Sequence, residues 1–192
     1  MGVKPTADGL AARAGAAASG KGPPPVHLWN PPFCGDIDMR IARDGTWHYL
    51  GSPIGRPALV RLFSSILRRE GDEFFLVTPA EKLRIRVDDA PFVAVDFTVT
   101  GAGRAQAITF TTHVGDTATA GADHPIRVRF ARDGDEPSPY VLIRAGLDAL
   151  IDRKSFYRLI DHAVHDEHRG ERWFGLWSGG QFFPVMRSGE LE

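Results

Sequence analysis

Cysteine is almost absent from the chain, because Cys34 is the only one among 192 residues. A single thiol excludes both an intramolecular disulfide and a metal cluster built on several thiolates. Such a composition fits a reducing compartment, and we therefore expect a cytoplasmic protein.

Long apolar runs and a surplus of either charge are also missing. No apolar run approaches the ~18 residues that a membrane-spanning helix needs, and the formal net charge is -1. This balance argues against general binding to nucleic acid or to membrane surfaces, since both usually need a large positive excess. Lysine is scarce too: four of the 23 basic residues are lysine and the others are arginine.

Hydrophobic residues make up 43% of the chain and charged residues 24%, which is typical of a globular protein. Residues 1–25 differ, because they are rich in alanine, glycine and proline, and we expect a flexible tail there. Ordered structure is expected from residue 26, as an N-terminal α+β domain over residues 26–87 and a β-rich α+β domain over residues 88–192.

Turn and helix signals divide the ordered part into elements. Asp44-Gly45 is a strong two-residue hairpin signal, and Pro57 suits the first position of a helix that Gly71 would end. A second helix is expected over residues 155–168. Between the helices, glycines separate several short strands, a spacing that predicts a curved antiparallel sheet or partial barrel.

Two segments, residues 54–86 and 151–185, align as diverged copies of one helix-plus-hairpin unit. At an offset of 97, Arg56 and Arg61 coincide with Arg153 and Arg158, and the apolar positions of the helices coincide as well. Shared amphipathic periodicity explains the apolar matches but not the paired arginines. We therefore expect an internal duplication, with the seam between the copies as a natural ligand cleft.

Arg56 and Arg153 each lie where a helix begins, although a helix N-terminus carries a partial positive charge. A negative group should therefore lie nearby, either a carboxylate such as Asp36, Asp38 or Asp152, or a bound phosphate. A structural salt bridge in each copy and an anion site are both open interpretations. Trp47 and Trp177 would pack in the core or, if exposed beside these arginines, stack on a base.

Asp36 and Asp38 stand two residues apart, so on a strand both would face the same side. Metal binding or acid–base chemistry would use such a pair, although aspartate is also common in turns at strand ends. His162, His165 and His168 recur every third residue, which makes a poor zinc tripod on a helix because each step rotates by roughly 60°. Phosphate-loop, nucleophile-elbow and zinc-protease motifs are missing, and we expect no metal and no cofactor.

Several ordered motifs resemble one bacterial protein family, called domain of unknown function 1285. They include Pro32-Phe33-Cys34-Gly35-Asp36-Ile37-Asp38, Leu76-Val77-Thr78-Pro79-Ala80-Glu81-Lys82 and Trp177-Ser178-Gly179-Gly180, and the resemblance covers residues 28–187. It implies two related α+β parts, of which the C-terminal one is loosely like a pleckstrin-homology fold. It also implies a ligand site between the parts, nucleotide-like ligands and a role in signalling, but no catalytic residues.

The leading hypothesis is a small ligand-binding protein, a candidate signal-transduction module that is not an enzyme. An anionic, nucleotide-like ligand would bind at the seam between the copies. The residues expected to hold it or line the site are Arg56, Arg153, Trp47, Asp36, Asp38, Thr78, Glu81, Lys82, Trp177 and Ser178. The alternatives are a metal-dependent hydrolase that uses Asp36 and Asp38, and a protein–protein adaptor that docks through an exposed β edge.

Overall fold

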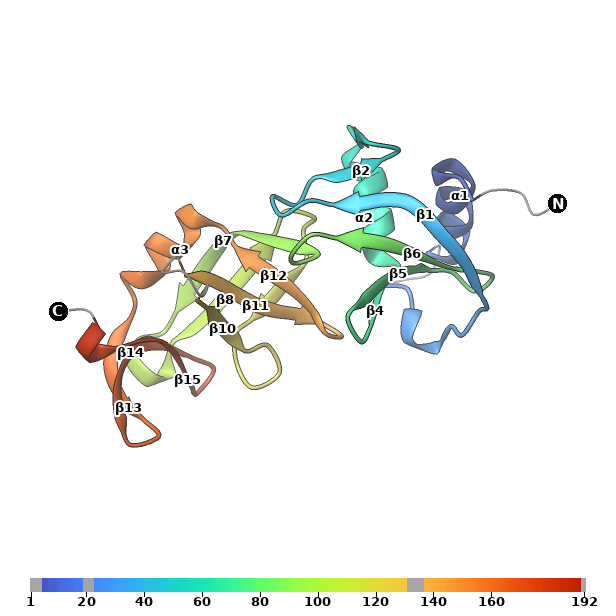
Figure 1. Cartoon of the computed structure of the whole chain (residues 1–192). Helices are drawn as coiled ribbons and strands as arrows, with labels where there is room; N and C mark the ends of the chain where they lie inside the picture. The colour runs from blue at the N-terminus through green and yellow to red at the C-terminus, as the bar shows by residue number, and fades with distance from the viewer. Residues whose placement is uncertain (1–4, 19–22, 131–136, 191–192) are drawn as a thin grey trace. The chain divides into compact units, whose positions relative to one another are not determined.

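The computed structural model describes residues 5–18, 23–130 and 137–190 of the chain. The chain forms two compact units, Met1–Pro91 and Phe92–Glu192. Both are α+β and consist mostly of sheet (Figure 1). No helix within the described ranges is long and apolar enough to cross a membrane.

The N-terminal unit contains one six-stranded sheet and two α-helices. Its elements are α1 (Ala7–Ala17), η1 (Val26–Leu28), β1 (Phe33–Ile41), β2 (Trp47–Tyr49), β3 (Ser52–Pro53), α2 (Pro57–Ser65), β4 (Leu67–Glu70), β5 (Glu73–Val77) and β6 (Lys82–Val87). The strand order is β3-β2-β1-β6-β5-β4. The central pair, β1 and β6, is parallel, whereas the other neighbouring pairs are antiparallel.

Alternation along β1 gives the sheet one apolar face and one charged face. Ile37, Met39 and Ile41 are buried, whereas Asp36 and Asp38, which alternate with them, are exposed, because successive side chains of a strand point to opposite faces. Helix α2 packs against the apolar face. There its Phe63 ring stacks on Trp47 of β2 with 6.2 Å between ring centroids.

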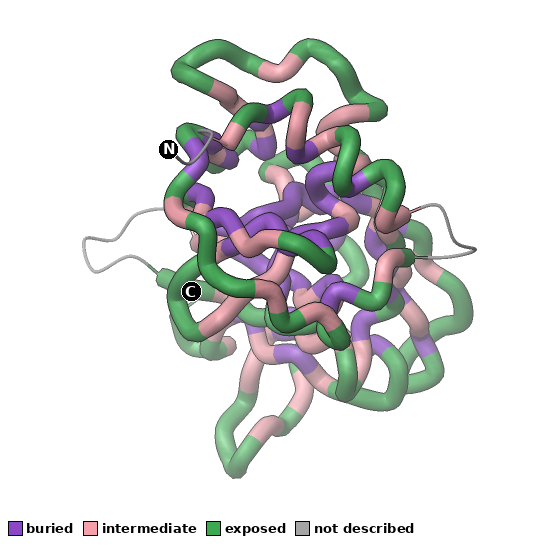
Figure 2. Tube along the Cα trace, turned by 90° about the vertical axis from the view of Figure 1, so that its right-hand side faces the viewer, coloured by how far each residue is buried: buried purple, intermediate pink, exposed green. Residues whose placement is uncertain are grey.

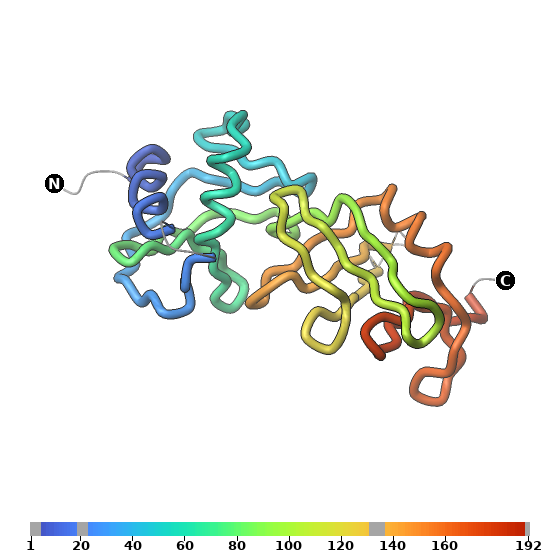
Figure 3. The backbone as a smooth tube through the Cα atoms, turned by 180° about the vertical axis from the view of Figure 1, so that it is seen from behind, coloured from blue at the N-terminus to red at the C-terminus, as the bar shows by residue number. Residues whose placement is uncertain are grey.

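Helix α1 contradicts the prediction of a flexible tail over residues 1–25, of which residues 1–4 and 19–22 lie outside the described residues. Thr6 caps the helix by accepting a hydrogen bond from the Gly9 N–H at 3.2 Å. Ala7, Leu10 and Ala14 follow at helical spacing and are buried. Helices α1 and α2 lie side by side (Figures 1 and 3). The alanines, whose abundance suggested a flexible tail, thus form part of the face of α1 that packs against the rest of the unit.

Both predicted helices end earlier than expected, and each is followed by a strand. Helix α2 ends at Ser65 rather than near Gly71, and residues 67–70 pair with β5. Helix α3 (Arg153–Ile160) ends eight residues before the predicted His168. The apolar residues after each helix fit a helical stripe, but backbone pairing in a sheet satisfies their N–H and C=O groups instead.

The C-terminal unit contains a six-stranded sheet, a three-stranded sheet and α3. Its strands are β7 (Phe92–Thr100), β8 (Ala107–Thr112), β9 (Thr117–Thr119), β10 (Ile126–Arg129), β11 (Ser138–Arg144), β12 (Leu147–Ile151), β13 (Val164–His168), β14 (Glu171–Ser178) and β15 (Gln181–Arg187), with short helical turns η2 (Gly103–Ala105) and η3 (Ser188–Glu190). The orders are β10-β11-β12-β7-β8-β9 and β13-β14-β15.

The six-stranded sheet is curved, as expected, but it is not wholly antiparallel. Strand β9 lies at one edge and still contacts β11, which is four strands away in the order, so the sheet curls like half of a barrel (Figure 1). Its central pair, β12 and β7, is parallel. Most of the buried residues belong to the strands, whereas the connecting loops are mostly exposed or half-buried (Figure 2).

The two segments that the sequence aligned contain the same elements in the same order. Helix α2 precedes the antiparallel strands β4, β5 and β6, and helix α3 precedes the antiparallel strands β13, β14 and β15. In the N-terminal unit these strands belong to the large sheet, whereas in the C-terminal unit they form a sheet of their own.

Gly175 supports a first prediction, because the strand pair β14–β15 leaves no room for a side chain there. An added Cβ would lie 2.4 Å from the Phe183 carbonyl oxygen and 2.7 Å from the Phe182 ring. We expect Gly175→Ala to destabilise the protein by about 1–3 kcal/mol through overpacking, measured by urea unfolding. Gly189→Ala is the control, since a Cβ there meets nothing within 4 Å. Equal stability of the two variants would contradict the packing at Gly175.

Candidate functional site

Acidic and basic side chains lie side by side on the two central strands of the N-terminal unit. Asp36 and Asp38 lie on the exposed face of β1, and Arg84 and Arg86 lie on the same face of β6. The Arg84 guanidinium donates to both oxygens of Asp36, at 2.7 and 3.1 Å, and to Glu73 at 2.5 Å. Arg86 donates one hydrogen bond to Asp38, at 3.1 Å.

The pairing of β1 with β6 is irregular at this point. Asp36 is paired with Arg84 and Arg40 with Arg86, so β1 advances four residues while β6 advances two. Such a bulge disrupts the ladder locally and bends the strand. Gly35, directly before the bulge, has a φ of 102°, which a residue with a side chain rarely adopts.

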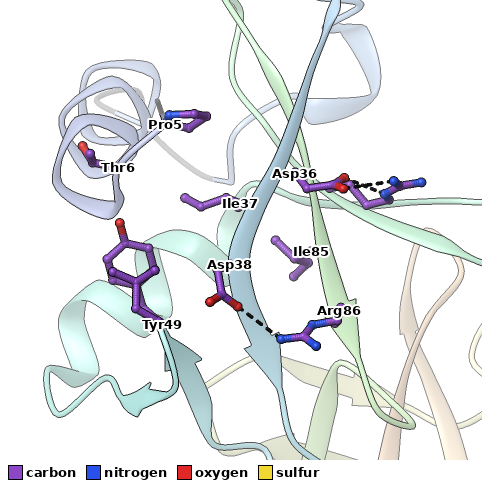
Figure 4. Close-up of a pocket in the computed structure, with 10 residues that line it drawn as sticks. Pro5, Thr6, Asp36, Ile37, Asp38, Tyr49, Ile85 and Arg86 are labelled. Atoms are coloured by element: carbon purple, nitrogen blue, oxygen red, sulfur yellow. Dashed lines mark hydrogen bonds and ion pairs between the residues drawn. The ribbon is translucent and has the colours of Figure 1, made fainter. Parts of the chain in front are cut away.

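A cavity of about 800 Å³ lies at this bulge, within the N-terminal unit (Figure 4). Its apolar lining comes from Pro5, Ile37, Leu50 and Ile85, and its polar lining from Thr6, Tyr49, Asp36, Asp38, Arg84 and Arg86. Figure 4 shows Tyr49 and Thr6 on one side of β1 and Asp36 on the other. An apolar pocket with a few polar groups is the usual form of a small-molecule site.

Arg84 controls the protonation of Asp36. The hydrogen bond from its guanidinium lowers the pKa of the Asp36 carboxyl, and the same contact raises the pKa of Arg84. Two strong donors hold the charged form of the carboxylate. The contact therefore favours the charged forms of both Asp36 and Arg84.

The two arginines predicted to bind an anion have different surroundings. Arg56 is the N-cap residue of α2 and forms an ion pair with Asp8 of α1, at 3.6 Å. Arg153 is the first residue of α3, and its guanidinium lies over the Tyr157 ring, 5.6 Å from the centroid. Asp152 caps α3 by accepting from the Ser155 N–H at 2.7 Å. Neither Arg56 nor Arg153 is among the residues that line the cavity.

The two predicted tryptophans differ in exposure. Trp47 is 1% exposed in the core of the N-terminal unit, so its ring offers no face to a ligand. Trp177 is partly buried in the C-terminal unit and donates to Asp166 at 3.0 Å, while Arg104 lies over its ring at 4.9 Å. Hydrogen bonds from the Glu167 N–H and then from Trp177 lower the pKa of Asp166.

The residues of the repeated turns that were predicted to line the site mostly form hydrogen bonds and ion pairs that stabilise the turns. Thr78 is buried and accepts hydrogen bonds from the N–H groups of Ala80 and Glu81. Glu81 forms an ion pair with Arg13 of α1, and Lys82 forms one with Glu70 at 2.9 Å.

Ser178 is buried as well, and it connects the two sheets of the C-terminal unit. Its hydroxyl accepts from the Ile108 N–H at 2.9 Å and donates to the Ala120 carbonyl at 2.7 Å.

Asp36 and Asp38 are the residues that the hydrolase alternative would use to hold a metal. Among residues 5–18, 23–130 and 137–190, no group of three or more His, Cys, Asp or Glu side chains could hold a metal ion. Both aspartates are paired with arginines, which compete with a cation for the carboxylates. His162, His165 and His168 do not share a helix, because the last two lie on β13.

Sequence reasoning found the aspartates of the cavity but missed Arg84, Arg86 and Tyr49. A signal for the arginines is present in the sequence: Asp36-Ile37-Asp38 and Arg84-Ile85-Arg86 have the same spacing and opposite charges. Opposite charges on one face of neighbouring strands stabilise their pairing. This pattern could have predicted that the two strands are neighbours.

Two family models and two crystal structures, all of one protein family, match most of the chain. The family model described as "Domain of unknown function (DUF1285), N-terminal domain" matches residues 24–90, and its C-terminal counterpart matches residues 91–185. A crystal structure of a DUF1285 family protein from Silicibacter pomeroyi DSS-3 is 66% identical, covers 97% of this chain and 99% of that one, and has a TM-score of 0.86.

A second similar crystal structure, also of a DUF1285 family protein, is from Shewanella baltica OS155. It is 29% identical, with a TM-score of 0.53, and the match covers 66% of this chain and 92% of that one. No curated protein matches the chain significantly.

The Asp36–Arg84 contact supports a second prediction, on titration. We expect the carboxyl of Asp36 to titrate below the ordinary aspartate pKa of about 3.9, measured by NMR. Arg84→Ala should return it towards that value, and Arg86→Ala, the control, should leave it unchanged. Because the folded-state pKa is lowered, the contribution to stability is present above the ordinary pKa and is lost as the pH falls through the folded-state pKa. An unchanged Asp36 pKa in Arg84→Ala would overturn this assignment.

Proposed function

The chain belongs to the family of domain of unknown function 1285, and from this premise we propose that it is a small-ligand-binding protein rather than an enzyme. The proposed ligand is an anionic, nucleotide-like molecule, and the proposed site is the cavity at the β1–β6 bulge. The sequence alone predicted a site at the seam between the two copies, whereas this proposal uses residues of the N-terminal unit.

The cavity is the observation that carries this proposal. Its volume of about 800 Å³ falls within the roughly 300–1,000 Å³ typical of ligand pockets. The apolar side chains of Ile37, Leu50 and Ile85 and the ring of Tyr49 offer contact area for a base or another flat group. The arginines at its rim offer donors for an anion.

Arg86 is the proposed anion-binding residue. Its side chain is 72% exposed and donates a single hydrogen bond, of 3.1 Å, to Asp38. An exposed ion pair of this kind contributes roughly 0–1 kcal/mol, so a phosphate could replace Asp38 as the partner at little cost. Arg84 is less suitable, because it already donates to two carboxylates.

A signalling role, a cytoplasmic location and a loose likeness of the C-terminal unit to the pleckstrin-homology fold belong to the same proposal. A curved sheet followed by one helix agrees with that likeness in outline. The exposed thiol of Cys34 suits a reducing compartment.

Binding can be tested by thermal unfolding of the full chain with a panel of mononucleotides, dinucleotides and cyclic nucleotides. A ligand present at a hundred times its Kd stabilises the folded state by about 2.7 kcal/mol, and we expect at least one compound to raise Tm. Arg86→Ala should abolish most of that shift, because it removes the proposed phosphate donor.

Arg40→Ala is the matched control for this experiment. Arg40 is also an exposed arginine of the N-terminal unit, paired with Asp88 at 2.8 Å, but it does not line the cavity. Arg56→Ala and Arg153→Ala test the two arginines that the sequence singled out. If the whole panel leaves Tm unchanged, or if Arg86→Ala and Arg40→Ala respond equally, this function and this site are wrong.

A further inference from the structure

One wall of the cavity comes from the residues directly before helix α1. Pro5 and Thr6 line the cavity and lead directly into α1, and Figure 4 shows both beside β1 at the start of that helix. Pro5 and Thr6 thus complete the cavity on one side.

Few contacts hold α1 in place. Leu10 is its only large buried side chain, and Ala7 and Ala14 supply the rest of the buried face. Two ion pairs anchor the helix, Arg13–Glu81 at 2.5 Å and Asp8–Arg56 at 3.6 Å. The side chains of the second pair are 91% and 72% exposed, and exposed pairs of this kind contribute little.

The sheet beneath has its own cover and does not depend on α1. Helix α2 buries Phe63 against Trp47 on the apolar face of the sheet. On the other face, η1 places Val26 against Phe75 and Val77. An 11-residue helix is marginal by itself in water, so α1 keeps its helical structure through its contacts with the rest of the unit.

We infer that residues 5–17 form a lid on the cavity, which opens when α1 detaches from α2 and from the β5–β6 turn. The inference rests on the proposed function, because a lid regulates access to a ligand site. When closed, Pro5 and Thr6 shield the floor of the cavity at Ile37. When α1 detaches, that floor is exposed to solvent and a ligand can enter or leave.

Thiol labelling of the full chain tests the lid without any ligand. In a Cys34→Ser background, Ile37→Cys places one thiol on the floor of the cavity, where Ile37 is 5% exposed. A small neutral reagent such as iodoacetamide then reports how often the cavity opens. We expect Leu10→Ala, which removes the main apolar anchor, to raise the labelling rate at least about tenfold.

The ion pair at Glu81 provides a second, reversible variant. Arg13→Glu should raise the labelling rate about threefold or more, because it replaces an attraction by a repulsion. Arg13→Glu combined with Glu81→Arg restores the opposite charges and should return the rate towards that of the parent. A general loss of stability would not be rescued in this way.

A second reporter separates opening of the lid from unfolding of the unit. Leu76 lies on β5, is fully buried and does not line the cavity. A thiol at this position, Leu76→Cys, therefore reports unfolding of the unit. Its labelling should stay slow in Leu10→Ala and in Arg13→Glu. The lid is disproved if these variants leave the Ile37→Cys rate unchanged, or if they accelerate Leu76→Cys equally.

The outcome for the lid can be distinguished from the outcome for the proposed function. Labelling needs no nucleotide, so a panel without any binder would refute the ligand class and leave the labelling result intact. With a nucleotide that does bind, Leu10→Ala should speed both association and dissociation. Unchanged rate constants for both steps would show that ligands bypass α1 and would overturn its role as a lid.

Discussion

The parallel pairing of β1 with β6 organises the N-terminal unit. Parallel neighbours cannot be joined by a tight turn, so the chain between them has to travel elsewhere, and it does so through β2, β3, α2, β4 and β5. Those elements extend the sheet on both sides of the pair and cover its apolar face. The cavity lies at the bulge within the same pair. Fold and candidate site therefore have one origin.

Apolar burial and backbone pairing, rather than the visible charges, hold this pair together. Ile37 and Ile85 are each 5% exposed, whereas the Asp36–Arg84 and Asp38–Arg86 ion pairs are largely exposed and therefore contribute little to stability. The ion pairs have a different use, because they favour this neighbour and this register over others. The charges at the cavity are thus inexpensive to rearrange around a ligand.

Local signals predicted much of the fold. Asp44-Gly45 forms the expected turn between β1 and β2, and Pro57 begins α2 as expected. The helix ends were predicted too late because residues such as Ile66 and Leu67 fit both a helical stripe and a strand, and only pairing with β5 decides between them. Helix α1 was missed because alanine carries little hydrophobic signal, although Ala7, Leu10 and Ala14 have helical spacing.

The candidate site was harder to predict than the fold, because it depends on which strands become neighbours. The aspartates were identified by their spacing, but their partners lie 48 residues further along the chain. Trp47 was misleading because its burial could not be known from the sequence. An aromatic residue next to a charged strand suggests a binding residue, but this ring is buried. Tyr49, two residues later, lines the cavity instead.

The separation of β1 from β6 along the chain also matters while the protein is being made. A ribosome releases β1 first and has to add almost fifty more residues before β6 can lie beside it. During that interval β1 can pair only with the short strand β2 on one edge, and its other edge is open to any strand nearby. Contacts between distant residues form slowly, and unpaired edges invite aggregation. Charged side chains on a strand discourage such pairing, and β1 carries Asp36 and Asp38 on its exposed face.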